Sequence, residues 1–224
     1  MADVLGTLVK YFEQGGPVMW PLLVCAVLGV TFVIERAWAL WQAGRKSDEF
    51  MARVQDALLQ QRSLSHARQL CDRYNIPVAR ILKAGLIKHG TSDEEIEKAI
   101  EIAITHELAR LERGFGVLAS VSNVAPLIGF LGTVTGMIGS FGELAQAGLS
   151  NPARVAAGIS EALITTATGL FIAIPVLMAY NFYSSRVQRF ILEMETAANL
   201  LLESYAVIES SGAAEGPRKA AAQG

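Results

Sequence analysis

Three long stretches of the chain contain no charged residue, and they separate it into apolar and polar segments. These stretches are residues 15–34, 114–142 and 162–185 of a 224-residue sequence. A helix needs about 20 predominantly apolar residues to cross the hydrocarbon core of a bilayer, and each stretch reaches that length. The pattern therefore predicts an all-α membrane protein with three transmembrane helices, the first of them at residues 15–41.

The helical pattern extends past the second charge-free stretch on its N-terminal side. Ser92 followed by Glu95 forms a capping box, which predicts a helix start. Apolar residues then recur at helical spacing into the apolar stretch, so one long helix containing the second span is expected over residues 93–142. Gly114, Gly116 and Pro126 are the positions where this helix could bend.

A second long helix is expected after a short outside loop at residues 143–150. Asn151 and Pro152 are typical of an N-cap followed by proline at the first helical position. Helical periodicity continues beyond the third span, which predicts a helix over residues 151–209. The tail at 210–224 is rich in Ala, Gly and Ser and is expected to be disordered.

The remaining segments are an N-terminal segment at residues 1–14 and a polar, helix-forming region at residues 42–92. The first apolar stretch could be a cleaved signal peptide. Its leader carries Asp3 and Glu13 against a single Lys10, and the stretch is longer than a typical signal core. A retained first span is therefore the preferred interpretation.

The basic residues predict the orientation. Of 19 Lys and Arg residues, 17 lie in residues 35–113 and 186–224, which share one side of a three-span protein. Basic residues near the ends of spans favour the cytoplasmic side. The N-terminus is therefore expected outside, with the helical region at 42–92 and the C-terminus in the cytoplasm.

Composition and motifs exclude several classes of protein. The net charge of −2 gives no basic surface for nucleic acid. Cys25 and Cys71 are expected at different depths, so a disulfide between them is not predicted. We find no phosphate-binding loop, no nucleophile motif and no metal-ligand spacing among the three histidines, so neither an enzyme nor a cofactor is expected.

Small residues form a strip along the second span. Glycines recur at intervals of three and four residues, and the strip consists of Gly129, Gly132, Gly136 and Gly139, with Ser122 and Ala125 before them. In lipid such strips let helices approach closely. Close packing alone explains the strip, and on this evidence it requires no further role.

Few polar groups lie within the second and third spans. Thr133, Thr165 and Thr166 are weak evidence individually, because a membrane threonine usually bonds a carbonyl of the preceding turn. Glu161 could face a cavity inside a helix bundle or lie in water at the outer interface, and both readings stay open. No other carboxylate, amine or imidazole lies in these spans, so this chain alone cannot form a proton relay.

Two motifs resemble the ExbB/TolQ/MotA family of proton-channel subunits. They are APLIGFLGTVTG at residues 125–136 and GISEALITTATG at residues 158–169, followed by Ile174-Pro175 and Tyr180-Asn181. The opening GGPVMWP at 15–21 and Ile34-Glu35-Arg36 also match, so the similarity covers nearly the whole chain. Three spans are similar to the ExbB and TolQ branch, whereas MotA-like subunits have four.

The resemblance implies a pentamer whose second and third helices line a pore around two ExbD- or TolR-like partner chains, each with one span and a proton-binding Asp. It implies that Thr133 and Thr166 face the pore, and that Glu161 is the acidic residue of the third helix. It also places Gly129, Gly132, Gly136, Gly139 and Gly169 in helix packing. Thr165 stands where the family often has alanine, so its role is open.

The resulting hypothesis is a stator-like channel subunit of a motor in the bacterial inner membrane, with its N-terminus in the periplasm. The motor would couple the proton motive force to a TonB-like transducer, for active transport across the outer membrane. A TolQ-like role in cell-envelope integrity and constriction is the alternative within the family. A non-conducting membrane scaffold is the alternative outside it. A self-contained transporter is disfavoured, because three spans without repeats do not provide a substrate site.

Overall fold

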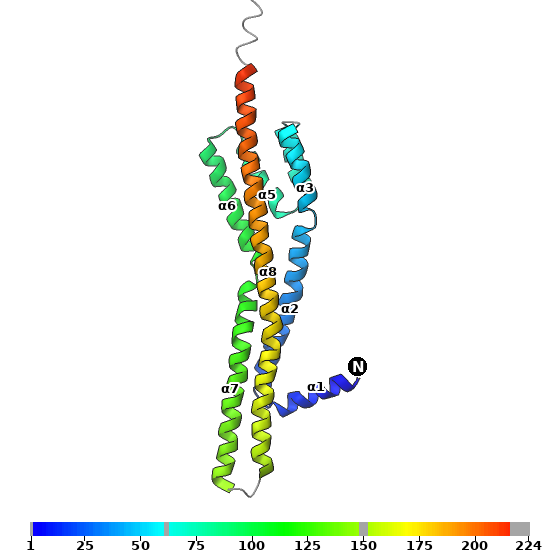
Figure 1. The fold of residues 1–224 in the computed structure, drawn as a ribbon, viewed down its shortest axis with the longest axis vertical. Coiled ribbons are helices and arrows are strands. Elements are labelled where there is room, and N and C mark those ends of the chain that lie inside the picture. The colour runs from blue at the N-terminus through cyan, green and yellow to red at the C-terminus, as the bar shows by residue number, and fades with distance from the viewer. Residues whose placement is uncertain (1, 61–62, 148–151, 216–224) are drawn as a thin grey trace, which may run out of the picture. The chain divides into compact units, whose positions relative to one another are not determined.

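A computed structural model describes residues 2–60, 63–147 and 152–215, and all secondary structure within those ranges is helical (Figure 1). The helices are α1 (Ala2–Gln14), α2 (Met19–Gly44), α3 (Ser47–Gln55), the π-helical η1 (Asp56–Gln60), α4 (Leu64–Arg73), α5 (Pro77–Ile87), α6 (Asp93–Leu111), α7 (Phe115–Ala147) and α8 (Pro152–Glu215).

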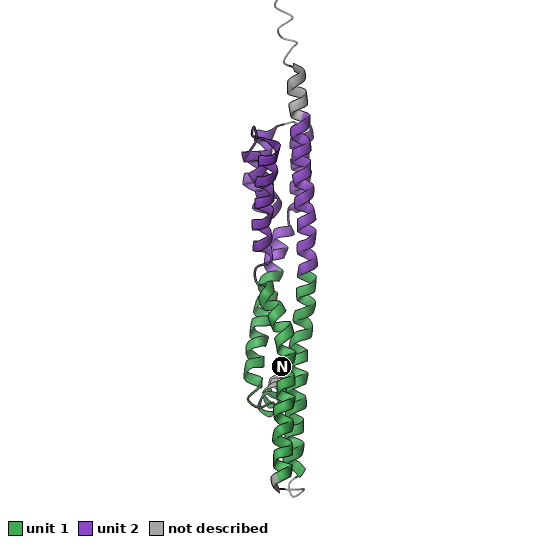
Figure 2. Cartoon of the chain, turned by 90° about the vertical axis from the view of Figure 1, so that its left-hand side faces the viewer, with its two compact units in different colours: residues 1–37, 114–183 green, residues 38–113, 184–224 purple. Residues whose placement is uncertain are grey.

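Three helical stretches are long and apolar enough to cross a membrane, as the sequence predicted. They lie within Met19–Leu59, Phe115–Ala145 and Pro152–Val207. The chain divides into two compact units, coloured separately in Figure 2. Unit 1 is Met1–Ala37 with Gly114–Tyr183, and unit 2 is Trp38–Arg113 with Ser184–Gly224. The charge-free stretches fall almost wholly in unit 1.

In unit 1, α7 and α8 run antiparallel with α2 packed against them. The antiparallel register is evident from the glycines, since Gly169 lies against Ala125 while Gly136 lies against Gly158. Gly29 of α2 contacts Val176 and Val121, which belong to the two other helices. The hydroxyl of Tyr183 donates a 2.9 Å hydrogen bond to the Val33 carbonyl, tying α8 to α2.

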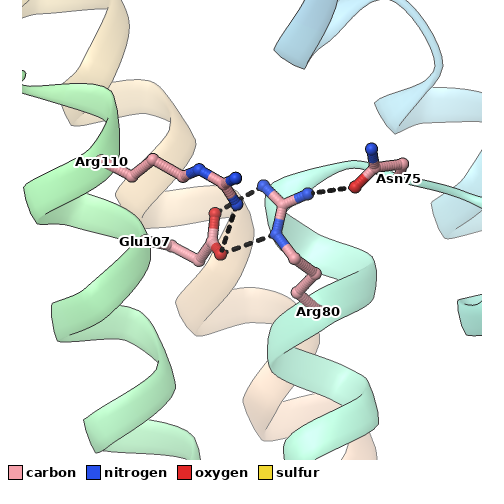
Figure 3. Close-up of polar contacts among 4 residues, drawn as sticks. All are labelled: Asn75, Arg80, Glu107 and Arg110. Carbon is pink, nitrogen blue, oxygen red and sulfur yellow. Dashed lines mark hydrogen bonds and ion pairs between the residues drawn. The ribbon is translucent and has the colours of Figure 1, made fainter.

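In unit 2, α5 packs against α6 and α8 through a close approach at Gly85, which lies against Ile100 and Leu201. An ion pair crosses from α5 to α6, where Arg80 Nη2 lies 2.6 Å from Glu107 Oε2 (Figure 3). Arg80 also donates to the side-chain oxygen of Asn75, which lies in the turn before α5. This ion pair fixes the turn between α4 and α5 to α6.

The prediction of one continuous helix over residues 93–142 is wrong, because the chain forms two helices there. α6 ends at Leu111, and α7 begins at Phe115. Gly114 between them has φ +86°, and a Cβ at this position would lie 2.8 Å from Phe32 Cδ1. Only glycine adopts that conformation without strain, so the helix stops here.

Other predicted boundaries shift by a few residues. Residues 2–14 are the helix α1, and α7 continues to Ala147, into the predicted outside loop. α8 runs to Glu215, so the first six residues of the predicted disordered tail are helical, whereas 216–224 lie outside the described residues. The predicted N-cap Asn151 also lies outside them. The cap at Ser92 is confirmed, since its hydroxyl accepts a 3.4 Å hydrogen bond from Glu95 N.

Candidate functional site

In the α7–α8 interface of unit 1, the backbones of the two helices come close together at glycines. A Cβ placed on Gly129 would lie 2.9 Å from the Thr165 carbonyl oxygen, and one on Gly136 would lie 2.9 Å from the Gly158 carbonyl oxygen. A Cβ on Gly169 would lie 2.6 Å from the Ala125 carbonyl oxygen. Side chains at these positions would force the two helices apart.

Gly132 and Gly139 differ in their surroundings. Gly132 faces the side chain of Thr165, which fills the space that a side chain at 132 would need. A Cβ on Gly139 would meet no described atom within 4 Å. Gly139 instead lines an open pocket between α7 and α8, so its predicted packing role stays a prediction.

Thr166 and Thr165 are adjacent on α8 and use their hydroxyls differently. Thr166 Oγ1 donates a 2.8 Å hydrogen bond across the interface to the Gly129 carbonyl. Thr165 is fully buried, and its hydroxyl donates to the Ala162 carbonyl of its own helix at 2.9 Å. Thr166 thus joins the two helices, and its oxygen keeps its capacity to accept a hydrogen bond.

Thr133 lies on another face of α7. Its hydroxyl donates a 2.6 Å hydrogen bond to the Phe130 carbonyl, one turn earlier. The side chain is half-buried at the edge of a shallow depression of about 500 Å³, lined otherwise by Val134, Met137, Ile138 and Phe141. No hydrogen bond among the described residues links Thr133 to Thr166.

Glu161 lies beside the turn between α1 and α2. Gly16 in this turn has φ +66°, and a Cβ there would collide with the Glu161 carboxylate. The same carboxylate opens onto a pocket of about 550 Å³. The pocket is lined by Gln14, Pro17, Thr135, Gly136, Gly139, Ser140, Glu143, Arg154, Ala157, Gly158, Ser160 and Glu161. Neither Thr133 nor Thr166 belongs to this lining.

Ser140 is a polar residue of the interface that sequence reasoning missed. Its buried hydroxyl lies 3.0 Å from the Gly136 carbonyl oxygen and 3.2 Å from the Val155 carbonyl oxygen of α8. The sequence does contain a pattern that indicates this role, because Ser140 follows Gly136 by four residues and continues the small-residue strip. At the rim of the pocket, Arg154 pairs with Glu143 at 3.4 Å.

The arrangement offers hydroxyls and one carboxylate along two close-packed helices, without a group that could carry a proton through the middle of either span. Hydroxyls both donate and accept hydrogen bonds, so they can order water or a carboxyl group. Among the described residues, no group of three His, Cys, Asp or Glu side chains could hold a metal ion. The arrangement can therefore hydrogen-bond water or a carboxyl group.

A family model for the MotA/TolQ/ExbB proton channel family matches residues 73–196, more than half of the chain. The chain belongs to this family. The match spans α7 and the first part of α8, including Thr133, Thr166 and Glu161. As a member of the MotA/TolQ/ExbB family, the chain is a multi-pass proton-channel subunit, and the prediction that it is not an enzyme is confirmed.

Several curated relatives are similar to this family member. An ExbB-like 1 protein of Synechocystis is 36% identical over 178 residues, which are 78% of this chain and 69% of the relative. The biopolymer transport protein ExbB of Salmonella typhimurium is 30% identical over 216 residues, covering 88% of each chain. The Tol-Pal system protein TolQ of Pseudomonas aeruginosa is 42% identical over 106 residues, covering 47% of this chain and 46% of TolQ.

Proposed function

We propose that this chain is the stator-like channel subunit of an inner-membrane motor that couples proton flow to a TonB-like transducer, for active transport across the outer membrane. The observation that carries the proposal is the α7–α8 interface, which holds hydroxyls at Thr166 and Ser140 but no proton carrier. A proton path built on it needs a carboxylate from another chain. Membership of the proton-channel family supports the same conclusion.

The partner proposed is an ExbD- or TolR-like protein with one span and a proton-binding Asp. Five copies of this chain would surround two partner helices, with Thr133 and Thr166 facing the pore. In the proposed orientation the N-terminus is periplasmic, and the pocket at Glu161 lies at the periplasmic end of the spans. One charge crossing 100 mV releases about 2.3 kcal/mol, so work at the outer membrane would require several protons.

In this mechanism the partner Asp takes up a proton on the periplasmic side, near Glu161. It passes the threonine hydroxyls in its neutral form and releases the proton to the cytoplasm. A threonine oxygen accepts the hydrogen bond of a protonated carboxyl without adding a charge, which lowers the cost of the passage. The mismatch between five subunits and two partner helices converts this cycle into rotation.

The test replaces Thr133 or Thr166 with Val and Glu161 with Gln, and measures proton-driven uptake in cells lacking the native subunit. We expect uptake to fall at least about tenfold in each variant, as for loss of one essential hydrogen bond of about 1.4 kcal/mol or more. Thr168→Val is the matched control, because the Thr168 hydroxyl donates to the Ile164 carbonyl of its own helix and the proposal does not place Thr168 in the proton path. Glu143→Gln is the control for charge at the same pocket.

The same variants separate the channel from a non-conducting scaffold. A scaffold tolerates Thr133→Val and Glu161→Gln and keeps full uptake, which would refute the proposal. Because Thr166→Val also removes the hydrogen bond to Gly129, its oligomer is checked by native mass spectrometry, and loss of uptake counts only where the assembly is intact.

A TolQ-like role is the second candidate, favoured by the 42% identity to TolQ of Pseudomonas aeruginosa over 106 residues. Complementation decides between the two roles. Expression in a strain lacking TolQ should leave its outer-membrane defect uncorrected if the TonB-coupled role holds. Expression in a strain lacking ExbB, together with the cognate partner, should restore TonB-dependent uptake.

A further inference from the structure

Two arginines, Arg45 and Arg186, lie next to Gly44 at the end of α2 in unit 2. Arg186 of α8 reaches towards this glycine, since a Cβ on Gly44 would lie 3.1 Å from Arg186 Nη2. The next residue, Arg45, places its guanidinium carbon 4.9 Å from the centre of the Trp41 ring. The Arg186 guanidinium lies 5.5 Å from the ring centre of Phe190 in the same way. Each arginine is thus held against an aromatic ring.

The position of this cluster coincides with a predicted membrane boundary. Arg186 is the first charged residue after the third charge-free stretch, and Arg45 follows the first span. Trp38 and Trp41 on the same end of α2 are 66% and 60% exposed, as expected for rings at a membrane interface. Arg45 and Arg186 are themselves exposed, so a molecule in the bilayer can reach them.

Two acidic groups of the neighbouring helices are engaged elsewhere. Glu193 of α8 accepts a 2.6 Å hydrogen bond from the Ser47 hydroxyl. Glu49 of α3 pairs with Arg53 at 2.8 Å. No ion pair between described residues involves Arg45 or Arg186, although Asp48 of α3 is exposed nearby in sequence. The pair of guanidinium groups therefore presents positive charge to the bilayer surface.

We propose that Arg45 and Arg186 bind the phosphate of an anionic phospholipid such as phosphatidylglycerol. Guanidinium groups match phosphate through paired N–H donors, and they keep their charge at the membrane interface. Trp41 and Phe190 hold the two guanidinium groups in place, and the absence of a side chain at Gly44 lets Arg186 and Phe190 lie close to α2. In the proposed orientation this site faces the cytoplasmic leaflet, where anionic lipids attract basic residues.

The test titrates the delipidated full chain in detergent with phosphatidylglycerol and with phosphatidylcholine of the same acyl chains, followed by native mass spectrometry. The native chain should prefer phosphatidylglycerol. Arg186→Gln and Arg45→Gln should each weaken phosphatidylglycerol binding about fivefold and leave phosphatidylcholine binding unchanged. Arg73→Gln combined with Lys88→Gln removes two exposed charges away from the site, and should have no effect.

A second variant keeps both charges. Gly44→Leu fills the space beside Arg186, and should weaken phosphatidylglycerol binding although the net charge of the chain is unchanged. Millimolar glycerol phosphate should not displace the lipid, because the acyl chains contribute to binding; displacement would mean a site for soluble phosphate and overturn the proposal. Equal loss in the Arg73/Lys88 control would reduce the effect to overall charge, and would also overturn it.

Discussion

The thiol of Cys71 is buried in α4, and this environment predicts that the thiol reacts slowly. Burial, together with the neighbouring Asp72 carboxylate, raises the pKa of this thiol to about 12. Cysteine reacts as the thiolate, so a thiol with this pKa stays protonated and inert at pH 7 to 9. The folded state also holds the proton more tightly than the unfolded state, so pH above about 9 favours unfolding.

The measurement uses a Cys25→Ala variant, in which Cys71 is the remaining cysteine. Maleimide should label it at a rate that stays low from pH 7 to pH 9 in the folded protein and rises at least about a hundredfold in denaturant. Ser65→Cys in a chain without Cys25 and Cys71 places an exposed thiol on the same helix as a control. Fast labelling of Cys71 in the folded protein would show that α4 opens readily.

The ion pair between Arg80 and Glu107 is a second residue-scale feature with a measurable consequence. The Glu107 side chain is only 10% exposed and receives two hydrogen bonds of 2.6 Å from Arg80 (Figure 3). Arg80→Met would leave a carboxylate nearly buried without this partner, and should cost about 3 kcal/mol in the free energy of unfolding. Arg53→Met removes an exposed pair with Glu49 and should cost less than about 1 kcal/mol.

Thermal unfolding in detergent compares the two variants. The Arg80→Met, Glu107→Met double variant should recover part of the loss, because it removes the buried charge as well. Equal losses from Arg80→Met and Arg53→Met would show that the Arg80–Glu107 pair is solvated and contributes little.

At the scale of the element, two glycines of the strip on α7 have different surroundings, although they look alike in the sequence. Gly129→Leu should drive the two helices apart, because a Cβ at 129 already meets the Thr165 backbone, and we expect a loss of about 3 kcal/mol or failure to assemble. Gly139→Leu points into open space and should leave the fold intact. Cysteine cross-linking between α7 and α8 monitors the interface in both variants, and an intact interface in Gly129→Leu would contradict the packing described.

The helices themselves were largely predictable, whereas their breaks and faces were not. Charge-free length identifies a span, and the Ser92 cap signals a helix start, since both are local properties. The break at Gly114 depends on the approach of Phe32, which is a tertiary contact. The helical rotation of α7 decides which side of the glycine strip meets α8, and no local pattern shows that a Cβ on Gly139 would have open space around it.

The grouping of the candidate site residues was not predictable from the sequence. Periodicity and resemblance selected Thr133, Thr166 and Glu161, and the structure distributes them over three different surroundings. The neighbours of Glu161 come from residues more than 140 positions earlier in the chain, at the α1–α2 turn. No short-range pattern encodes such a neighbour.

At the scale of the whole molecule, the proposed function predicts the composition of the complex. Native mass spectrometry of the tagged chain from its own membranes should find five copies with two copies of a small, single-span, Asp-bearing protein. A hydroxyl-lined interface without a proton carrier requires such a partner for conduction. A homo-oligomer without it, under extraction that retains lipid, would favour the scaffold hypothesis.

Gly16 and Glu161 are far apart in the sequence but lie next to each other in the structure, so the residue at one position limits what the other can be. A side chain at 16 needs the space that the Glu161 carboxylate occupies, and the positive φ at 16 already disfavours any residue but glycine. A side chain at residue 16 would therefore displace the Glu161 carboxylate from its place beside the turn. If Glu161 is needed for proton uptake, selection that maintains the third span also acts on residue 16 in the turn after α1.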